Sequence, residues 1–260
     1  MSIPNSFLDR TKSFFAEIGD MTFFAGRFFR ELFSAPFEFK ELIRQCYNMG
    51  IRSLFLVTVT GFILGLVFTL QSRPTLMDLG AESWMPSMIS ISIVREIGPV
   101  IIALICAGRI GSGIGAELGS MRVTEQIDAM EVSGTNPFKY LVVTRILAVT
   151  LMLPLLVIAG DTIALIGSAI VENLKGDVSY TLYFNKVFDA LSFSDVLPAT
   201  VKTVFFGFAI GLVGTYKGYN CAKGTVGVGE ASNSAVVYTS MLLFIIDFIA
   251  VFVSDIFFEL

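Results

Sequence analysis

The stretch Ile93-Val-Arg-Glu-Ile-Gly-Pro-Val-Ile-Ile-Ala-Leu-Ile-Cys106 decides how this chain folds. It lies in a longer apolar run over about 86–110, which is long enough to cross the roughly 30 Å hydrocarbon core of a bilayer as a helix. Toward one end it carries two adjacent charges, Arg95 and Glu96. A charge deep in a bilayer costs on the order of 2.5–3.5 kcal/mol, so we expect both side chains to be paired or functional.

The composition of the whole chain agrees with a membrane location. Of its 260 residues, 54% are hydrophobic and only 15% are charged, and the mean hydropathy is +0.76. A soluble protein of this size could not bury so much apolar surface. The sequence predicts an all-α polytopic membrane protein, and no basic stripe points to nucleic acid.

Five apolar segments are long enough to span the membrane. They cover about 51–71, 86–110, 138–170, 196–219 and 234–257. Lys and Arg concentrate before the first span and in the second and fourth connections, whereas the other connections hold Arg73, Lys175 and Lys186. Because cytoplasmic loops carry the excess of positive charge, the N-terminus is predicted to be cytoplasmic and the C-terminus to lie on the opposite, outer side of the membrane.

Residues 1–47 form a region of their own in this prediction, ahead of a five-span domain over 48–260. Phenylalanines alternate there with Lys and Arg, a pattern typical of an amphipathic helix lying in the membrane interface. An ordinary cytoplasmic helical segment is the alternative. Pro36 is predicted to divide the region into two helices. Glycines four apart, such as Gly61 and Gly65, predict close helix packing within or between subunits.

Charged residues inside the predicted spans are the candidate site. These are Arg95, Glu96, Asp161, Lys202 and Asp247, all roughly 12–14 Å below the outer surface at about 1.5 Å per residue. Adjacent helical residues do not face each other, so Arg95 and Glu96 need partners on other helices. Arg95 with Asp161 or Asp247, and Glu96 with Lys202, are possible pairs. The network is either structural or lines a cavity for an anionic lipid head group.

The second cytoplasmic connection, about 117–133, is predicted to be a short amphipathic helix. Apolar residues at 118, 121, 127 and 130 would face the membrane. A set of charged residues would face a cytoplasmic partner: Glu117, Arg122, Glu125, Asp128 and Glu131. A solvated connecting helix is the alternative reading.

Several kinds of chemistry are not expected of this chain. It has no histidine, and Cys46, Cys106 and Cys221 stand apart, so neither a metal site nor a disulfide framework is predicted. The run Gly111-Ser-Gly-Ile-Gly-Ala116 fits a dinucleotide-binding pattern but follows a helical span instead of a strand. No P-loop motif occurs, so the chain is not expected to hydrolyse ATP itself.

Five runs together resemble the permease subunit of MCE-associated lipid ABC transporters, the MlaE type. They are Arg95-Glu-Ile-Gly-Pro99, Ala107-Gly-Arg-Ile-Gly-Ser112, Ala116-Glu-Leu-Gly-Ser120, Met121-Arg-Val-Thr-Glu-Gln-Ile-Asp-Ala-Met-Glu131 and Asn136-Pro-Phe-Lys-Tyr-Leu-Val-Val-Thr-Arg145. The resemblance extends from about residue 45 to the end of the chain.

This resemblance implies a homodimeric permease in the inner membrane of Gram-negative bacteria. A cytoplasmic ABC ATPase, which holds the ATP and Mg²⁺, would bind through residues 117–133 as a coupling helix. A STAS-domain subunit would sit on the ATPase, and a ring of MCE-domain subunits would cap the periplasmic side. Phospholipid would pass between the dimer cavity and that ring. This transport would help to maintain the lipid asymmetry of the outer membrane.

Carried onto this sequence, the resemblance implies a lipid pocket with an apolar and a polar part. The apolar part is Phe68, Leu70, Leu76 and Leu79, and the polar part is Arg95, Glu96 and Lys202. Asp161 and Asp247 are assigned to this polar network only because they are predicted to lie at the same depth in the membrane. Two rival functions are an ion-coupled secondary transporter using the intramembrane carboxylates, for which no inverted repeat is found, and a lipid-modifying enzyme, which lacks a nucleophile or metal set.

Overall fold

The computed structural model describes the backbone of residues 6–35, 37–176 and 178–258, and the side chains from residue 15 to residue 256 with the same two gaps. Within these ranges the chain is helical and has no strand. Five helical segments are long and apolar enough to cross a membrane, which confirms the predicted fold class. They cover Phe39–Asp78, Glu82–Val123, Phe138–Gly176, Phe193–Tyr219 and Thr225–Ile256.

Most spans correspond to one long helix each. In chain order the helices outside the second span are α1 (Ser6–Leu32), α2 (Phe39–Asp78), α6 (Gln126–Val132), η4 (Phe138–Val143), α7 (Thr144–Gly176), α8 (Tyr180–Ala190), α9 (Phe193–Tyr219) and α10 (Thr225–Phe258). At 40 residues α2 is about 60 Å long, twice the hydrocarbon thickness, so it extends well beyond the predicted 51–71. Its N-terminal turns carry polar residues into the head-group region.

The second span is divided into short pieces. They are η1 (Glu82–Trp84), α3 (Met85–Ser92), η2 (Ile93–Ile97), α4 (Gly98–Cys106), η3 (Ala107–Gly111) and α5 (Ser112–Val123). Both η2 and η3 are π-helical turns, which insert a residue into the regular helix and often occur at functional sites. Among the described residues a third π-helical stretch, η4, begins the third span, so the second span holds two of the three.

Small residues bring the helices together around α7. A side chain at Gly61 of α2 would meet the carbonyl oxygen of Gly160 at 2.5 Å, and Gly65 lies closer still against the backbone of Ala164. On another side of α7, a Cβ atom at Gly211 of α9 would lie only 2.8 Å from the Cα of Ile146. These small-residue faces pack within one chain, and they fix α7 at the centre of the bundle.

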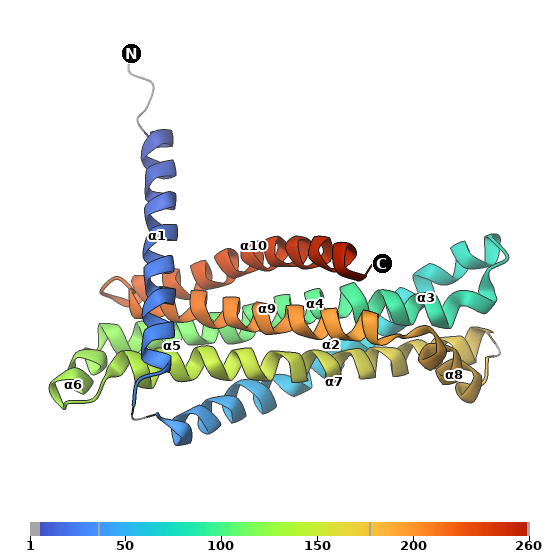
Figure 1. Ribbon diagram of the computed structural model, residues 1–260, viewed down its shortest axis with the longest axis horizontal. Coiled ribbons are helices and arrows are strands. Elements are labelled where there is room, and N and C mark those ends of the chain that lie inside the picture. Colours follow the sequence, from blue (N-terminus) through green and yellow to red (C-terminus); the bar gives the residue numbers. More distant parts are fainter. Residues whose placement is uncertain (1–5, 36, 177, 259–260) are drawn as a thin grey trace, which may run out of the picture.

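Helix α1 runs across the ends of the spans instead of along them (Figure 1). Phe24 and Phe28 point into the bundle, where the Phe24 ring lies 4.9 Å from that of Phe138 at the start of the third span. Phe23 and Phe33 are more than 80% exposed. The aromatic residues therefore divide between two faces: one docks α1 onto the spans and the other is available to the membrane interface. Pro36 lies outside the described residues.

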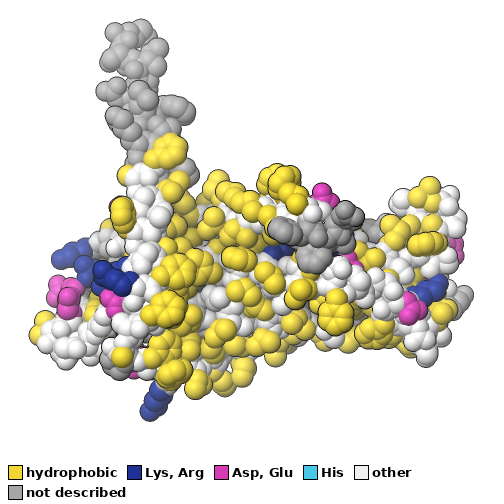
Figure 2. Space-filling model, viewed as in Figure 1, with side chains coloured by type: hydrophobic (Ala, Val, Ile, Leu, Met, Phe, Trp, Pro, Cys, Tyr) yellow, Lys and Arg dark blue, Asp and Glu magenta, His cyan; other side chains and the backbone are white. Residues whose placement is uncertain are grey.

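The distribution of apolar and charged side chains on the surface of the bundle is the one expected for a protein in a lipid bilayer. Figure 2 shows apolar side chains over the middle of the visible face and charged side chains mainly toward its two ends. The exposed apolar residues of α10 include Met241, Phe244, Phe248 and Phe252. Such a surface is stable in lipid, or against another apolar helix, and not in water.

Candidate functional site

The backbone at Arg95 and Glu96 is shaped by the proline that follows. Pro99 has no N–H and cannot donate to the carbonyl of Arg95, four residues earlier. The chain adopts the π turn η2 at this point, and α4 begins at Gly98 with Pro99 in its first turn. The consequence is an unusual local direction for the side chains of Arg95 and Glu96, which reach toward α9 and α10.

Lys202 of α9 joins three spans. Its ammonium group lies 2.6 Å from Glu96 and 3.0 Å from Asp247 of α10. The Lys202 side chain is only 4% exposed, so the two carboxylates provide the charge-assisted hydrogen bonds that a buried cation needs. The predicted pair of Glu96 with Lys202 is confirmed, and Asp247 belongs to the same group.

Arg95 contacts a partner that the sequence did not suggest. Its guanidinium lies 3.9 Å from Asp195, and not near Asp161 or Asp247 as predicted. Asp195 also accepts hydrogen bonds from the backbone N–H and the hydroxyl of Ser192, at 3.0 and 2.6 Å. This is a capping box that begins α9. The Ser-x-x-Asp spacing could have predicted the cap, but it gives no hint of the arginine.

Asp161 of α7 is buried, and one of its carboxyl oxygens has no hydrogen-bond donor among the described residues. Its side chain is 7% exposed, and among the described residues no group donates to its Oδ1 atom. That oxygen lies against Gly98, where a Cβ atom would collide with it. Asp161 also lines a cavity of about 130 Å³ together with Pro99 and Pro154. A carboxyl group in this position is costly unless it is neutral or meets a ligand or water.

The intramembrane centre carries more acids than bases. Two cations, Arg95 and Lys202, stand among four carboxyl groups, those of Glu96, Asp161, Asp195 and Asp247. Residues from the second, third, fourth and fifth spans thus meet at one level. The arrangement can hold a polar or charged ligand group inside the membrane, because both signs of charge are present within a few ångströms.

The four apolar residues predicted for the lipid pocket do not come together. Leu76 is buried in a cluster with Met85 and Ile89, and Phe68 packs against it. Leu70 is 40% exposed and Leu79 is 73% exposed, so both point away from the bundle. The small cavity beside Arg95 and Glu96 is lined instead by residues of α9 and α10. Within one chain, the charged residues and the apolar residues predicted for the lipid pocket therefore lie in separate places.

The connecting segment predicted as one helix over 117–133 is two helices. The second span continues through α5 to Val123, Glu125 takes a left-handed conformation with φ of 59°, and α6 follows. An ion pair of 2.6 Å between Arg122 and Asp128 closes the corner. A non-glycine residue with positive φ ends a helix, and this ending corrects the prediction of continuity.

The apolar face of this segment packs on the core of the bundle instead of facing the membrane as predicted, whereas its charged face is largely exposed. Leu118 and Ile127 are buried, whereas Glu125 and Glu131 are exposed. Arg122, Asp128 and Glu131 line one polar cleft of about 550 Å³, together with Arg27 and Tyr219. Glu117 stands apart from this group because its carboxylate lies 2.8 Å from the buried guanidinium of Arg145.

These observations define a class of protein: a multi-pass α-helical membrane protein with an ionised centre between its spans and a polar corner at one end, the architecture of a transport permease. Residues 42–253 match the family model described as Permease MlaE. The chain therefore belongs to the MlaE permease family.

Curated relatives agree with this assignment. A probable ABC transporter permease protein of Rickettsia felis is 37% identical, and the match covers 100% of this chain and 99% of the relative. A probable ABC transporter permease protein of Synechocystis is 32% identical over 87% of this chain and 86% of its own. The intermembrane phospholipid transport system permease protein MlaE of Haemophilus influenzae is 31% identical over 81% of each chain.

Proposed function

We propose that this chain is the permease subunit of an ATP-driven phospholipid transporter in a bacterial inner membrane. The observation that carries the proposal is the family match over residues 42–253, together with the phospholipid transport named for the Haemophilus influenzae relative. Lipid would move between the inner membrane and a periplasmic MCE-domain partner. The N-terminus would lie in the cytoplasm and the C-terminus in the periplasm, as the distribution of Lys and Arg indicates.

The ionised centre is the proposed contact for the lipid head group. Arg95 and Lys202 supply positive charge for a phosphate, and Glu96 and Asp247 are the ion-pair partners of Lys202 inside the membrane. The apolar residues Leu70 and Leu79 are exposed in the single chain. A homodimer would give them a cavity to line, and the exposed apolar face of α10 is suited to lining the same cavity or to lipid contact.

The polar corner is the proposed contact for the ATPase. Exposed Asp128 and Glu131 lie on α6 and line the cleft of about 550 Å³, and exposed Glu125 lies at the corner just before α6. ATP and Mg²⁺ would be held by the ATPase, and a STAS-domain subunit would bind that ATPase. Closure of the ATPase pair would move α6, and α5 would transmit the movement along the second span to Arg95 and Glu96.

A charge reversal at the corner tests the coupling. Glu125→Lys with Asp128→Lys should reduce both co-purification of the ATPase and lipid-stimulated ATP hydrolysis. Glu82→Lys with Asp189→Lys is the matched control, because both acids are exposed at the opposite end of the bundle. Full co-purification and normal hydrolysis in the corner variant would contradict the proposed contact.

A second experiment tests the lipid contact. Arg95→Ala and Lys202→Ala should each lower the amount of phospholipid recovered with the purified complex. Unchanged recovery would assign the network a purely structural role.

One observation favours a second candidate function, an ion-coupled secondary transporter. The Oδ1 atom of the buried Asp161 has no hydrogen-bond donor among the described residues, so this oxygen is available to bind a proton. Transport that continues without the ATPase but stops when the proton gradient is removed would support this alternative over the first.

A further inference from the structure

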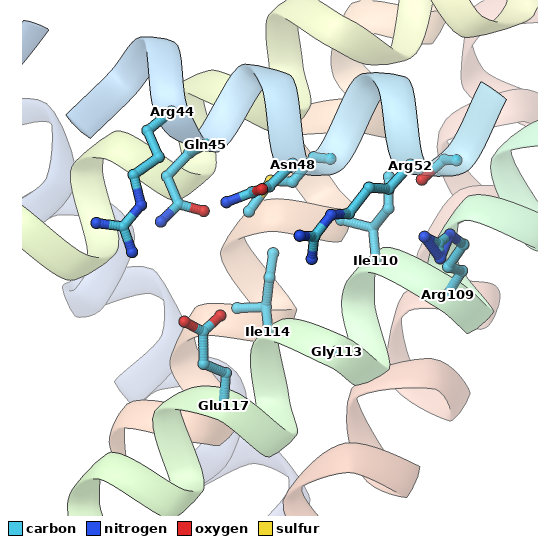
Figure 3. Close-up of a pocket in the computed structure, with 11 residues that line it drawn as sticks. Arg44, Gln45, Asn48, Arg52, Arg109, Ile110, Gly113, Ile114 and Glu117 are labelled. Carbon is cyan, nitrogen blue, oxygen red and sulfur yellow. The ribbon is translucent and has the colours of Figure 1, made fainter. Parts of the chain in front are cut away.

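A cleft of about 540 Å³ opens between the N-terminal half of α2 and the end of the second span. From α2 it is lined by Arg44, Asn48 and Arg52, which are four residues apart and share one stripe of the helix. From η3 and α5 it is lined at the same spacing by Arg109, Gly113 and Glu117. Figure 3 shows the guanidinium groups of Arg44 and Arg52 extending from α2 into the gap.

The positive charge in this cleft is not balanced by the protein. Neither Arg52 nor Arg109 forms an ion pair or side-chain hydrogen bond with any described residue. Glu117 is held by Arg145, and Glu41 lies 3.3 Å from Arg44. Two helices therefore direct unpaired cations toward one shared space. Cations confined in this way repel each other and attract an anion.

The cleft lies at head-group depth. No charged residue occurs between Arg52 and Arg73 on α2, or between Glu96 and Arg109 on the second span. Arg52 and Arg109 thus mark the ends of the uncharged stretches that cross the hydrocarbon core. Arg109 lies 13 residues beyond Glu96, about 20 Å along the helix, so this is a different site from the ionised centre.

An apolar stripe on α2 runs beside the arginine stripe. Tyr47, Ile51 and Phe55 are four residues apart, and their side chains are 57%, 55% and 79% exposed. This stripe leads from the cleft toward the middle of the bilayer. A ligand with an anionic head and apolar tails would match both stripes, whereas a free anion would use only one.

We propose that this cleft binds the phosphate group of a phospholipid from the leaflet at the α6 end of the spans, with Arg52 and Arg109 as its ligands. In the proposed orientation that leaflet is the cytoplasmic one. Arginine is suited to the role because its planar guanidinium can donate two parallel hydrogen bonds to phosphate oxygens. The site goes beyond the proposed head-group contact at Arg95 and Lys202 and is independent of it.

Removing the charge tests the site directly. The purified full-length chain is titrated with dioleoylphosphatidylglycerol and, separately, with dioleoylglycerol, and bound lipid is counted by native mass spectrometry. Arg52→Gln with Arg109→Gln should lose one bound phosphatidylglycerol, with at least about tenfold weaker affinity, because two charged hydrogen-bond donors are removed. Dioleoylglycerol binding should not change.

A matched variant controls for net charge. Arg30→Gln with Lys223→Gln removes the same two charges at exposed positions outside the cleft, and it should keep the lipid. Equal phosphatidylglycerol binding by the cleft variant and this control would overturn the proposal. An Arg95→Ala variant examined in the same way reports on the other site, so failure of one proposal is distinguishable from failure of the other.

Filling the cleft tests the site without a change of charge. A Cβ atom at Gly113 would meet nothing within 4 Å, so Gly113→Leu should fold and place its side chain in the cleft. Gly108→Leu is the control, because the space at Gly108 is equally open but this residue does not line the cleft. Gly113→Leu should lose the same lipid and Gly108→Leu should keep it. If a folded Gly113→Leu chain still binds this phosphatidylglycerol, the assignment of the lipid to the cleft is wrong.

Competition identifies the source of the phosphate. Millimolar inorganic phosphate should leave phosphatidylglycerol bound, because the apolar stripe holds the acyl chains. Displacement by inorganic phosphate would instead assign the site to a free anion and overturn the lipid assignment. The Arg52→Gln, Arg109→Gln variant could instead stop forming a dimer and still bind all of its lipid. That result would show that a second copy of the chain covers the two arginines, and it would also overturn the lipid proposal.

Discussion

The ammonium group of Lys202 lies 2.6 Å from the carboxylate of Glu96, which links the fourth span to the π turn of the second. Lys202 also lies 3.0 Å from Asp247 in the fifth span. One buried cation therefore holds three spans in register. Because a charge in the bilayer is stable only with its partners, this link specifies which helices are neighbours.

Removing the cation should destabilise the bundle. Lys202→Met leaves Glu96 and Asp247 without a partner, and we expect a loss of about 2–3 kcal/mol. The loss is at the low end for a broken buried pair because the Glu96 side chain is 38% exposed and keeps some hydration. Thermal unfolding in detergent, followed by circular dichroism, measures the effect.

The control for this experiment is Lys175→Met, which removes an exposed lysine from the end of α7. It should leave the unfolding temperature unchanged. Adding Glu96→Gln and Asp247→Asn to Lys202→Met should recover part of the lost stability, because neutral amides cost less to bury than unpaired carboxylates. If the triple variant is no more stable than Lys202→Met, the pairing argument is wrong.

A double-mutant cycle tests the contact between Gly98 and Asp161. Gly98→Ala places a methyl group against the Asp161 carboxyl and 2.9 Å from the carbonyl oxygen of Ile93. We expect a loss of about 1–3 kcal/mol. Asp161→Ala removes one of the two collisions, so the double variant should lose less than the sum of the single changes, by about 1 kcal/mol. Additive effects in thermal unfolding would show that the two residues do not touch.

Sequence reasoning was effective where the signal was local or rested on the cost of a buried charge. The spans followed from apolar length, and the pairing of Glu96 with Lys202 followed from the need of each charge for a partner at the same depth. Asp195 was missed because it lies at the start of α9, where an acid after Ser192 is typical of a cap. The ion pair with Arg95 depends on how two helices pack, which no local pattern records.

The same limit applies to the polar corner between α5 and α6 and to α1. The apolar spacing grouped Leu118 and Ile127 on one face, but that face packs on the protein core and not on the membrane, and the break at Glu125 has no glycine or proline to announce it. In α1 the sequence offers phenylalanines on several sides. Phe28 is buried because it packs in a cluster with residues of the third and fourth spans, among them Phe138 and Leu212, whereas Phe33 is exposed.

The docking of α1 can be tested with two phenylalanines. Phe28 is 2% exposed, belongs to the same core cluster as Phe138 and Leu212, and has its ring 5.6 Å from that of Phe208, so Phe28→Ala should cost about 3–5 kcal/mol of local packing. Phe33 is 85% exposed, and Phe33→Ala should have no effect on stability. Limited proteolysis of α1 measures the difference: faster cleavage is expected for Phe28→Ala alone. Equal cleavage of both variants would contradict the observed division of the aromatic residues.

Tyr183 of α8 gives a prediction about alkaline pH. Its hydroxyl donates to Ser168 of α7 at 2.7 Å, and burial raises the pKa of Tyr183 to about 12. Because the folded-state pKa lies above the unfolded value of about 10, this contribution to stability is complete below pH 10 and is lost as the pH rises through about 12.

Tyr183→Phe removes the hydrogen bond and should cost about 1 kcal/mol at pH 7. Unfolding temperatures measured from pH 7 to pH 12 should show wild type losing this advantage above pH 10, because only wild type must keep a buried phenol protonated. A constant difference across the whole range would mean that the Tyr183 hydroxyl ionises without resistance from its surroundings.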